Sequence, residues 1–106
     1  MENKLSSFTA PVFELLKTIP RGKVMTYGLV AKYCKIKNPR NVGWILRQND
    51  NPEAIPCYKV VLSNGKLAQG YKFGGRKEQK EKLEKDGIEF DELGKIKNLK
   101  NILFKK

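Results

Sequence analysis

Cys57 is the residue of this 106-residue chain whose type and setting most directly suggest covalent chemistry. It lies between Pro56 and Tyr58, just before a strand-like run. Cysteine thiolates are strong nucleophiles, and a catalytic cysteine is usually paired with a base, most often histidine. The chain contains no histidine. Cys57 is therefore either a nucleophile with another source of activation or a small buried residue.

The chain carries a large excess of positive charge, with 22 Lys and Arg against 11 Asp and Glu and a net charge of +11. Such a field attracts polyanions, nucleic acid first and anionic membranes second, although the lysines can also serve only to solvate the surface. No segment resembles a signal peptide, and none approaches the roughly 18 apolar residues of a membrane span. We therefore expect a cytoplasmic protein with two free thiols, Cys34 and Cys57. Two thiols without histidine argue against a zinc site, and no other metal or cofactor is indicated.

Hydrophobic spacing predicts three short helices in the first half of the chain. They are expected over residues 9–18, 27–34 and 39–49. Thr9, Thr26 and Asn38 can cap their N-termini, and Pro39 suits the first position of the third helix. A tight turn separates the last two helices, which gives a helix-turn-helix pattern. The second helix of that pair carries Arg40, Asn41 and Arg47.

The second half of the chain predicts a hairpin and a charged helix. Asn64-Gly65 is a strong turn signal within the run 58–71, and the helix after Gly75 should end with Gly87 as its C-cap. A short strand over 88–90 and an amphipathic helix over 96–103 can follow. The expected fold is mainly α with a small β hairpin (α+β), a single winged helix-turn-helix-like DNA-binding domain over residues 1–106.

Three segments carry a family resemblance: "IPRGKVMTYGLVA", "NPRNVGWILRQNDNPEAIPCYKVV" and "SNGKLAQGYKFGGRKEQKEKLEKDGI". In order and spacing they resemble the C-terminal domain of the O6-alkylguanine-DNA alkyltransferases and the related alkyltransferase-like proteins, over about residues 8–90. The family's active-centre pattern Pro-Cys-His-Arg-Val stands here as Pro56-Cys57-Tyr58-Lys59-Val60. The N-terminal domain that precedes this region in the alkyltransferases has no counterpart in the chain, as in the alkyltransferase-like proteins.

The resemblance implies a DNA repair protein that binds double-stranded DNA, flips O6-alkylguanine out of the stack and transfers the alkyl group irreversibly to Cys57. It assigns Arg40 to the gap left by the flipped base and Tyr27 to rotating and hydrogen-bonding the nucleotide. Asn49 braces the turn before the active-site loop, and Asp86 stands where the family usually has glutamate, at the far end of the relay that serves the cysteine. The loop that closes over the base corresponds to Tyr71, Lys72, Phe73 and Gly74.

Departures from the family leave more than one function open. The alkyltransferase-like proteins replace the cysteine, whereas this chain keeps Cys57 and replaces the histidine by Tyr58. An ordinary thiol is already a few per cent thiolate near neutral pH, and Lys59, Lys72 and Arg76 can enlarge that fraction. We therefore expect a slow, single-turnover methylated-DNA–[protein]-cysteine methyltransferase, monomeric and associated with the nucleoid. The alternatives are a non-enzymatic lesion sensor that recruits downstream repair proteins and a basic nucleic-acid-binding module without lesion preference.

Overall fold

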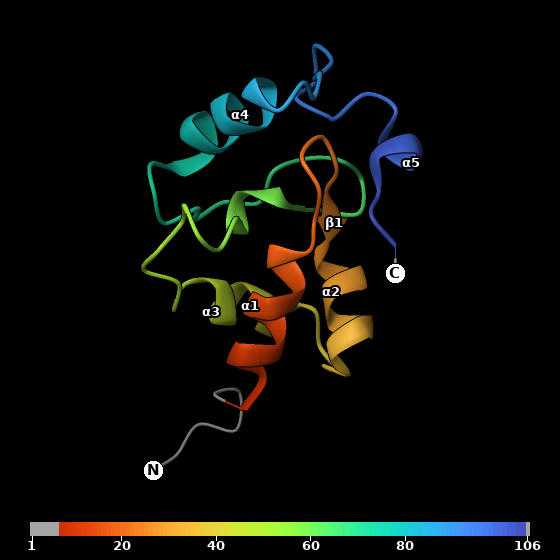
Figure 1. Cartoon of the computed structure of the whole chain (residues 1–106). Coiled ribbons are helices and arrows are strands. Elements are labelled where there is room, and N and C mark those ends of the chain that lie inside the picture. The colour runs from red at the N-terminus through yellow and green to blue at the C-terminus, as the bar shows by residue number, and fades with distance from the viewer. Residues whose placement is uncertain (1–6, 106) are drawn as a thin grey trace.

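The structure of the chain is a computed structural model that describes residues 7–105. In chain order its elements are α1 (Thr9–Lys17), β1 (Met25–Thr26), α2 (Tyr27–Cys34), α3 (Arg40–Leu46), the 3₁₀ helix η2 (Cys57–Lys59), β2 (Val60–Val61), α4 (Gly75–Lys85) and α5 (Leu99–Ile102). Figure 1 shows α1, α2 and α3 gathered in one half of the molecule and α4 lying across the other. The prediction of a mainly helical protein with little β structure is confirmed.

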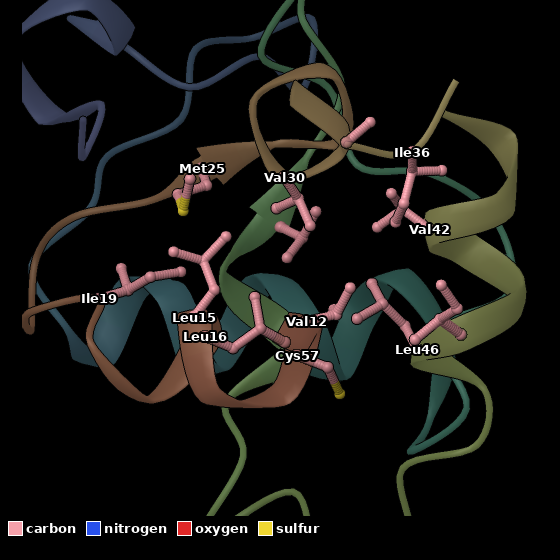
Figure 2. Close-up of a cluster of buried hydrophobic side chains, with 13 residues drawn as sticks. Val12, Leu15, Leu16, Ile19, Met25, Val30, Ile36, Val42, Leu46 and Cys57 are labelled. Atoms are coloured by element: carbon pink, nitrogen blue, oxygen red, sulfur yellow. The ribbon is translucent and has the colours of Figure 1, made fainter. Parts of the chain in front are cut away.

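The three N-terminal helices contact one another in every pairing and enclose the larger of two apolar clusters. On α1, Val12, Leu15 and Leu16 lie on one face at helical spacing and are buried, which removes that face from water. Cys57 belongs to the same cluster, and Figure 2 shows its side chain among these residues. The position of the thiol is therefore set by the packing of α1, α2 and α3.

Helix starts follow the predicted capping at α2 but not at α1. The Thr26 hydroxyl oxygen accepts a hydrogen bond from the Leu29 backbone N–H at 3.1 Å, as an N-cap residue should. Thr9 is instead the first residue of α1, because a 3₁₀ turn at residues 7–8 leads into the helix and leaves Phe8 as an N-cap without a side-chain bond. α2 ends at Cys34, and the left-handed backbone of its C-cap residue Lys35 (φ 58°) turns the chain toward α3.

The second helix of the helix-turn-helix pair is shorter than predicted. Asn38 does act at its start, since its side-chain oxygen accepts from the Arg40 backbone N–H at 3.0 Å. Pro39 occupies the N-cap position, so α3 begins one residue later than expected, at Arg40. The helix ends at Leu46 rather than near Asn49. The shorter helix leaves Asn49 free to act in the following loop.

The strands form a parallel pair, and the predicted hairpin is wrong. β1 and β2 pair in parallel, with Met25 opposite Val60. The turn at residues 64–65 does form, with Gly65 at φ +85°, but its arms share a bond from the Leu62 N–H to the Lys66 carbonyl and then separate. Both strands are fully buried, whereas residues 66–70 offer one buried side chain. Burial therefore favours the pairing of two distant segments over the local hairpin.

The end of α4 places Asp86 at a defined point. The C-cap residue is Asp86, one residue earlier than predicted, and Gly87 follows it with a left-handed backbone at φ +89°. The Gly87 N–H donates to the Glu84 carbonyl at 2.9 Å, and the Ile88 N–H donates to the Leu83 carbonyl at 3.1 Å. This paired arrangement is the Schellman motif, with Ile88 and Leu83 in one apolar cluster. The helix end therefore fixes the Asp86 carboxylate next to the active-centre segment.

The C-terminal segment covers the second apolar cluster, which lies beneath α4. Val24 bridges in parallel to Leu103 and donates its N–H to the Ile102 carbonyl at 2.9 Å. Phe90 and Ile96 form an antiparallel bridge, so the helix predicted over 96–103 is confined to α5. Within residues 7–105, no helix has both the length and the apolarity to cross a membrane.

Candidate active site

Cys57 begins η2, immediately after a loop stiffened by Pro56. The residue is only 5% exposed. Fully buried Asn49 holds the loop, since its amide nitrogen donates to the Ile55 carbonyl at 2.8 Å and its oxygen accepts from the Asn51 N–H at 2.9 Å. The Cys57 N–H donates to that same Ile55 carbonyl at 2.8 Å. One asparagine therefore fixes both the loop and the backbone of the cysteine.

A small cavity of about 50 Å³ opens beside the thiol. Of the residues predicted to form the site, it brings together Cys57, Tyr27, Arg47, Tyr71 and Lys72. Tyr27 reaches it from the first position of α2, directly after the Thr26 cap. The remaining lining residues are Gly43, Leu46, Gln69, Gly70 and Gln79. The cavity is therefore walled by the helix-turn-helix pair, the loop at residues 69–72 and α4.

Arg40 lies in a second, more open hollow of about 280 Å³. The two hollows share Tyr27, Gly43 and Gln69, so they adjoin along these three residues. Arg40 is exposed at the first position of α3 and lines this second hollow but not the cavity beside Cys57. Asn41, also predicted to bind, is half-buried and lines neither hollow.

The electrostatic surroundings of Cys57 only partly favour its thiolate. Burial raises the pKa of the thiol, whereas a hydrogen bond from the Asn49 side chain and the positive charges of Lys82 and Lys72 oppose that rise. Lys59 was also expected to increase the thiolate fraction of Cys57, and this expectation is wrong. Its buried ammonium donates to the Ile19 carbonyl at 3.0 Å instead. The net result is a thiol that is mostly protonated at neutral pH.

Tyr58 and Asp86 are in contact, as the resemblance implied. The Tyr58 hydroxyl donates to a carboxylate oxygen of Asp86 at 2.7 Å, and the Arg21 guanidinium lies 3.7 Å from the other oxygen. Burial, together with this carboxylate, raises the pKa of Tyr58 far above its ordinary value. Tyr58 lines a different hollow from Cys57. Tyr58 is therefore held protonated as a hydrogen-bond donor to Asp86.

The segment Tyr71–Gly74 connects the cavity to α4. The Lys72 ammonium donates to the carbonyls of Arg47 and Asn49, at 3.2 and 3.1 Å, which ties the segment to the chain just after α3. The rings of Tyr71 and Phe73 meet edge to face at 5.7 Å. Gly74 has φ +110°, and a Cβ there would collide with the Glu78 side chain. Gly74 therefore allows the tight entry into α4 and does not line the cavity.

Two residues of α4 were not predicted from the sequence. Gln79 is 3% exposed, lines the cavity and donates to the carbonyls of Tyr58 and Val60 at 3.0 and 3.2 Å. Lys82 donates to the Tyr71 hydroxyl at 2.8 Å. Gln79, Lys82 and Asp86 have the spacing i, i+3, i+7, which places them on one side of α4 and its C-cap. This spacing from Asp86 was the signal in the sequence that could have identified Gln79 and Lys82.

Within residues 7–105, no three Cys, Asp or Glu side chains gather as a metal site.

Comparison with known proteins places this arrangement in a family. Residues 7–88 match the family described as 6-O-methylguanine DNA methyltransferase, DNA binding domain. The chain belongs to this family. The recognised region contains both hollows, the active-centre segment and the whole of α4.

Individual relatives differ in how much of their length the chain spans. A bifunctional methyltransferase/endonuclease of Picrophilus torridus is 42% identical over 81 residues, 76% of this chain but 26% of that protein. A DNA base-flipping protein of Vibrio parahaemolyticus is 37% identical over 93 residues, 87% of this chain and 91% of its own. The crystal structure of S. pombe Atl1 with damaged DNA containing O6-carboxymethylguanine aligns over 100% of both chains, with 30% identity and a TM-score of 0.80.

Proposed function

We propose that the protein repairs DNA by binding a duplex that carries O6-alkylguanine, flipping that base into the cavity beside Cys57 and accepting its alkyl group on the thiol. The reaction runs once per molecule, because the thioether formed is stable. The observation that carries the proposal is the Cys57 thiol lining a cavity that adjoins the Arg40 hollow through Tyr27. The family match and the relatives named for base flipping and for binding damaged DNA support it.

DNA binding is assigned to the helix-turn-helix formed by α2 and α3. The net charge of +11 supplies the attraction to phosphates. Arg40, exposed at the start of α3, enters the gap that the flipped base leaves, where a planar cation can stack and hydrogen-bond. Tyr27 stands between the two hollows and guides the base from one to the other. The protein acts where cellular DNA is, in the cytoplasm at the nucleoid.

The chemistry is a displacement at the alkyl carbon. The Cys57 sulfur forms a bond to that carbon while the bond from the carbon to O6 of guanine breaks, and the electron pair stays on the base. The proton lost by the thiol restores the N1–H of guanine, so the products are a thioether and an ordinary guanine. Burial raises the pKa of Tyr27, which keeps its hydroxyl protonated and able to donate to the departing base.

Entry of a purine requires the cavity to open. Its volume of about 50 Å³ is well below the roughly 300 Å³ at which small-molecule pockets begin. The segment that moves is residues 69–74, of which 69–72 line the cavity; Tyr71 and Phe73 pack against each other in it, and Gly70 and Gly74 have positive φ. Ordering of this segment over the bound base would exclude water from the thiol.

Intact mass spectrometry tests the proposal. The protein is incubated with a duplex containing one O6-methylguanine, and the intact protein should gain the mass of one CH₂ group. Digestion should then locate this gain on the Cys57 peptide. Cys57→Ala should bind the same duplex and gain no mass, and an undamaged duplex should leave the parent unmodified. Absence of any gain in the parent, on DNA that it demonstrably binds, would overturn the transfer step.

A lesion sensor that binds alkylated DNA without transfer is the second candidate. The raised pKa of Cys57 favours it, because little thiolate is present at neutral pH. The histidine position is also occupied by Tyr58, whose hydroxyl is committed to Asp86. Tight binding to the lesion duplex over the plain duplex, without mass gain after long incubation, would identify this function. Equal affinity for both duplexes without any mass gain would contradict both candidates and indicate a general nucleic-acid-binding module.

A further inference from the structure

Lys82 places a positive charge beside the active site, in the hollow that it lines together with Tyr58 and Asp86. Its ammonium donates to the Tyr71 hydroxyl at 2.8 Å. It also lies over three aromatic rings, with the nitrogen 5.8 Å from the centroid of Tyr58, 5.3 Å from Tyr71 and 5.9 Å from Phe73. Cation–π contacts of this kind hold a cation in place while leaving its charge unneutralised. The structure therefore fixes one ammonium between the active-centre segment and the loop beside the cavity.

The charge of Lys82 acts on Cys57. Tyr71 and Cys57 line the same cavity, and Lys82 binds the hydroxyl of Tyr71. Because the ammonium uses a lone pair of that hydroxyl, Tyr71 keeps its own hydrogen to donate. The positive charge of Lys82 lowers the pKa of Cys57 against the rise caused by burial. Lys82 is therefore linked to the cavity of Cys57 by its bond to Tyr71, and its positive charge acts on the thiol.

Other charged and titratable groups near Cys57 do not have the same geometry. Apart from Lys82 and its partner Tyr71, they are Tyr27 from α2, Arg47 after α3, Lys72 from the loop, and Tyr58 and Lys59 from η2. The Lys72 ammonium is engaged by two backbone carbonyls, and that of Lys59 by the Ile19 carbonyl. Lys82 instead bonds a hydroxyl in the cavity wall itself.

We propose that Lys82 is the residue that promotes thiolate formation at Cys57 in place of the missing histidine, acting through its charge and through the Tyr71 hydroxyl. Lys82 is a positioning residue, since it acts on the nucleophile and takes no proton from it. The rings of Tyr71 and Phe73 belong to the segment that must move for a base to enter, so the activation depends on the position of that segment. The inference deepens the proposed function and rests on it for its biological meaning.

Alkylation of the thiol by iodoacetamide, without DNA, tests the inference independently of methyl transfer. Rates are measured across a pH series by peptide mass spectrometry, with Cys34 of the same molecule as an internal reference. Lys82→Met is compared with Lys82→Arg, which keeps the charge, and with Tyr71→Phe, which removes the connecting hydroxyl. Lys80→Met is the matched control, because Lys80 is also on α4 and over an aromatic ring, Phe90 at 5.5 Å.

Lys82→Met should slow alkylation of Cys57 at neutral pH by about three- to tenfold, because loss of the positive charge raises the pKa of the thiol and leaves less thiolate. At high pH the rate of Lys82→Met should reach the plateau of the parent, because Cys57 is ionised in both proteins there. Lys82→Arg should restore most of the rate, Tyr71→Phe should slow it, and Cys34 should not change. An unchanged pH profile in Lys82→Met overturns the inference, as does an equal shift in Lys80→Met. A Lys82-dependent profile in a protein that transfers no methyl group would overturn only the proposed function.

Discussion

Replacing Tyr58 by phenylalanine tests whether this residue has a structural or a chemical role. The substitution removes the hydroxyl that donates to Asp86 at 2.7 Å and keeps the ring. Hydrogen bonds to charged groups contribute about 1.5–3 kcal/mol, and the partial exposure of Tyr58 favours the lower end of that range. We therefore expect the free energy of unfolding to fall by about 1.5 kcal/mol, which lowers Tm by about 5–10 °C in a domain of this size.

The effect on stability should depend on pH in one direction. The pKa of Tyr58 is raised in the folded protein, so its contribution is fully present below the ordinary tyrosine pKa of about 10. It is lost as pH rises above that value. Urea denaturation of the parent and of Tyr58→Phe should therefore give the same difference in unfolding free energy at pH 7 and 9, and a smaller one at more alkaline pH. A double-mutant cycle with Asp86→Ala should yield a coupling of about 1–2 kcal/mol.

Methyl transfer by Tyr58→Phe should stay within about twofold of the parent, because the Tyr58 hydroxyl donates to Asp86 and does not activate Cys57. Loss of a general base would instead slow transfer by about 10²-fold or more. The assay follows the methylated Cys57 peptide with time at a temperature at which both proteins are folded. A rate lower by about a hundredfold in a folded variant would place Tyr58 in the activation of Cys57 and refute the interpretation that it only anchors Asp86. A coupling energy near zero would refute the structural role.

Three further outcomes are expected. Affinity for duplex DNA should fall about a hundredfold between about 50 and 200 mM salt if about four phosphates are contacted, and a salt-independent affinity would contradict phosphate-dominated binding. Arg40→Ala should weaken binding to lesion DNA by about tenfold and binding to plain duplex much less, measured by fluorescence anisotropy; equal losses would mean ordinary phosphate contact. Tyr58→His should raise the methyl-transfer rate about tenfold or more at neutral pH and shift its pH profile to lower pH, whereas an unchanged profile would show that activation is not limiting.

Local signals in the sequence predicted the helices better than the sheet. The Thr26 cap depends on a hydroxyl and an N–H three residues apart, so it can be read from the sequence, and it is confirmed. The hairpin was inferred from the Asn-Gly turn, which is also local. What decides the sheet is the burial of Met25 opposite Val60, two residues far apart in the chain. Short-range patterns carry no information on such a pairing.

The sequence predicted side-chain contacts near Cys57 where a family motif identifies the residues. It missed contacts that depend on how a helix is oriented. The contact between Tyr58 and Asp86 follows from the family pattern, and the structure has it at 2.7 Å. Lys59 was expected to help the thiol because it is close in sequence, but η2 turns its ammonium toward Ile19. Lys82 looked like one of many charges on an exposed helix. Its role depends on which face of α4 lies toward the cavity, and this is set by packing of the second apolar cluster.

Different residues serve the two proposed steps, lesion binding and alkyl transfer. In the proposed function, base flipping uses Tyr27 and Arg40, which line the two adjoining hollows, and it needs no ionised thiol. The proposed transfer depends on the thiolate of Cys57, which burial disfavours and which Asn49 and Lys82 favour. A change that alters the thiolate fraction should alter the transfer rate without altering affinity. The time that the protein stays on a lesion, compared with the time that Cys57 needs to react, then decides whether a given encounter ends in repair or only in recognition.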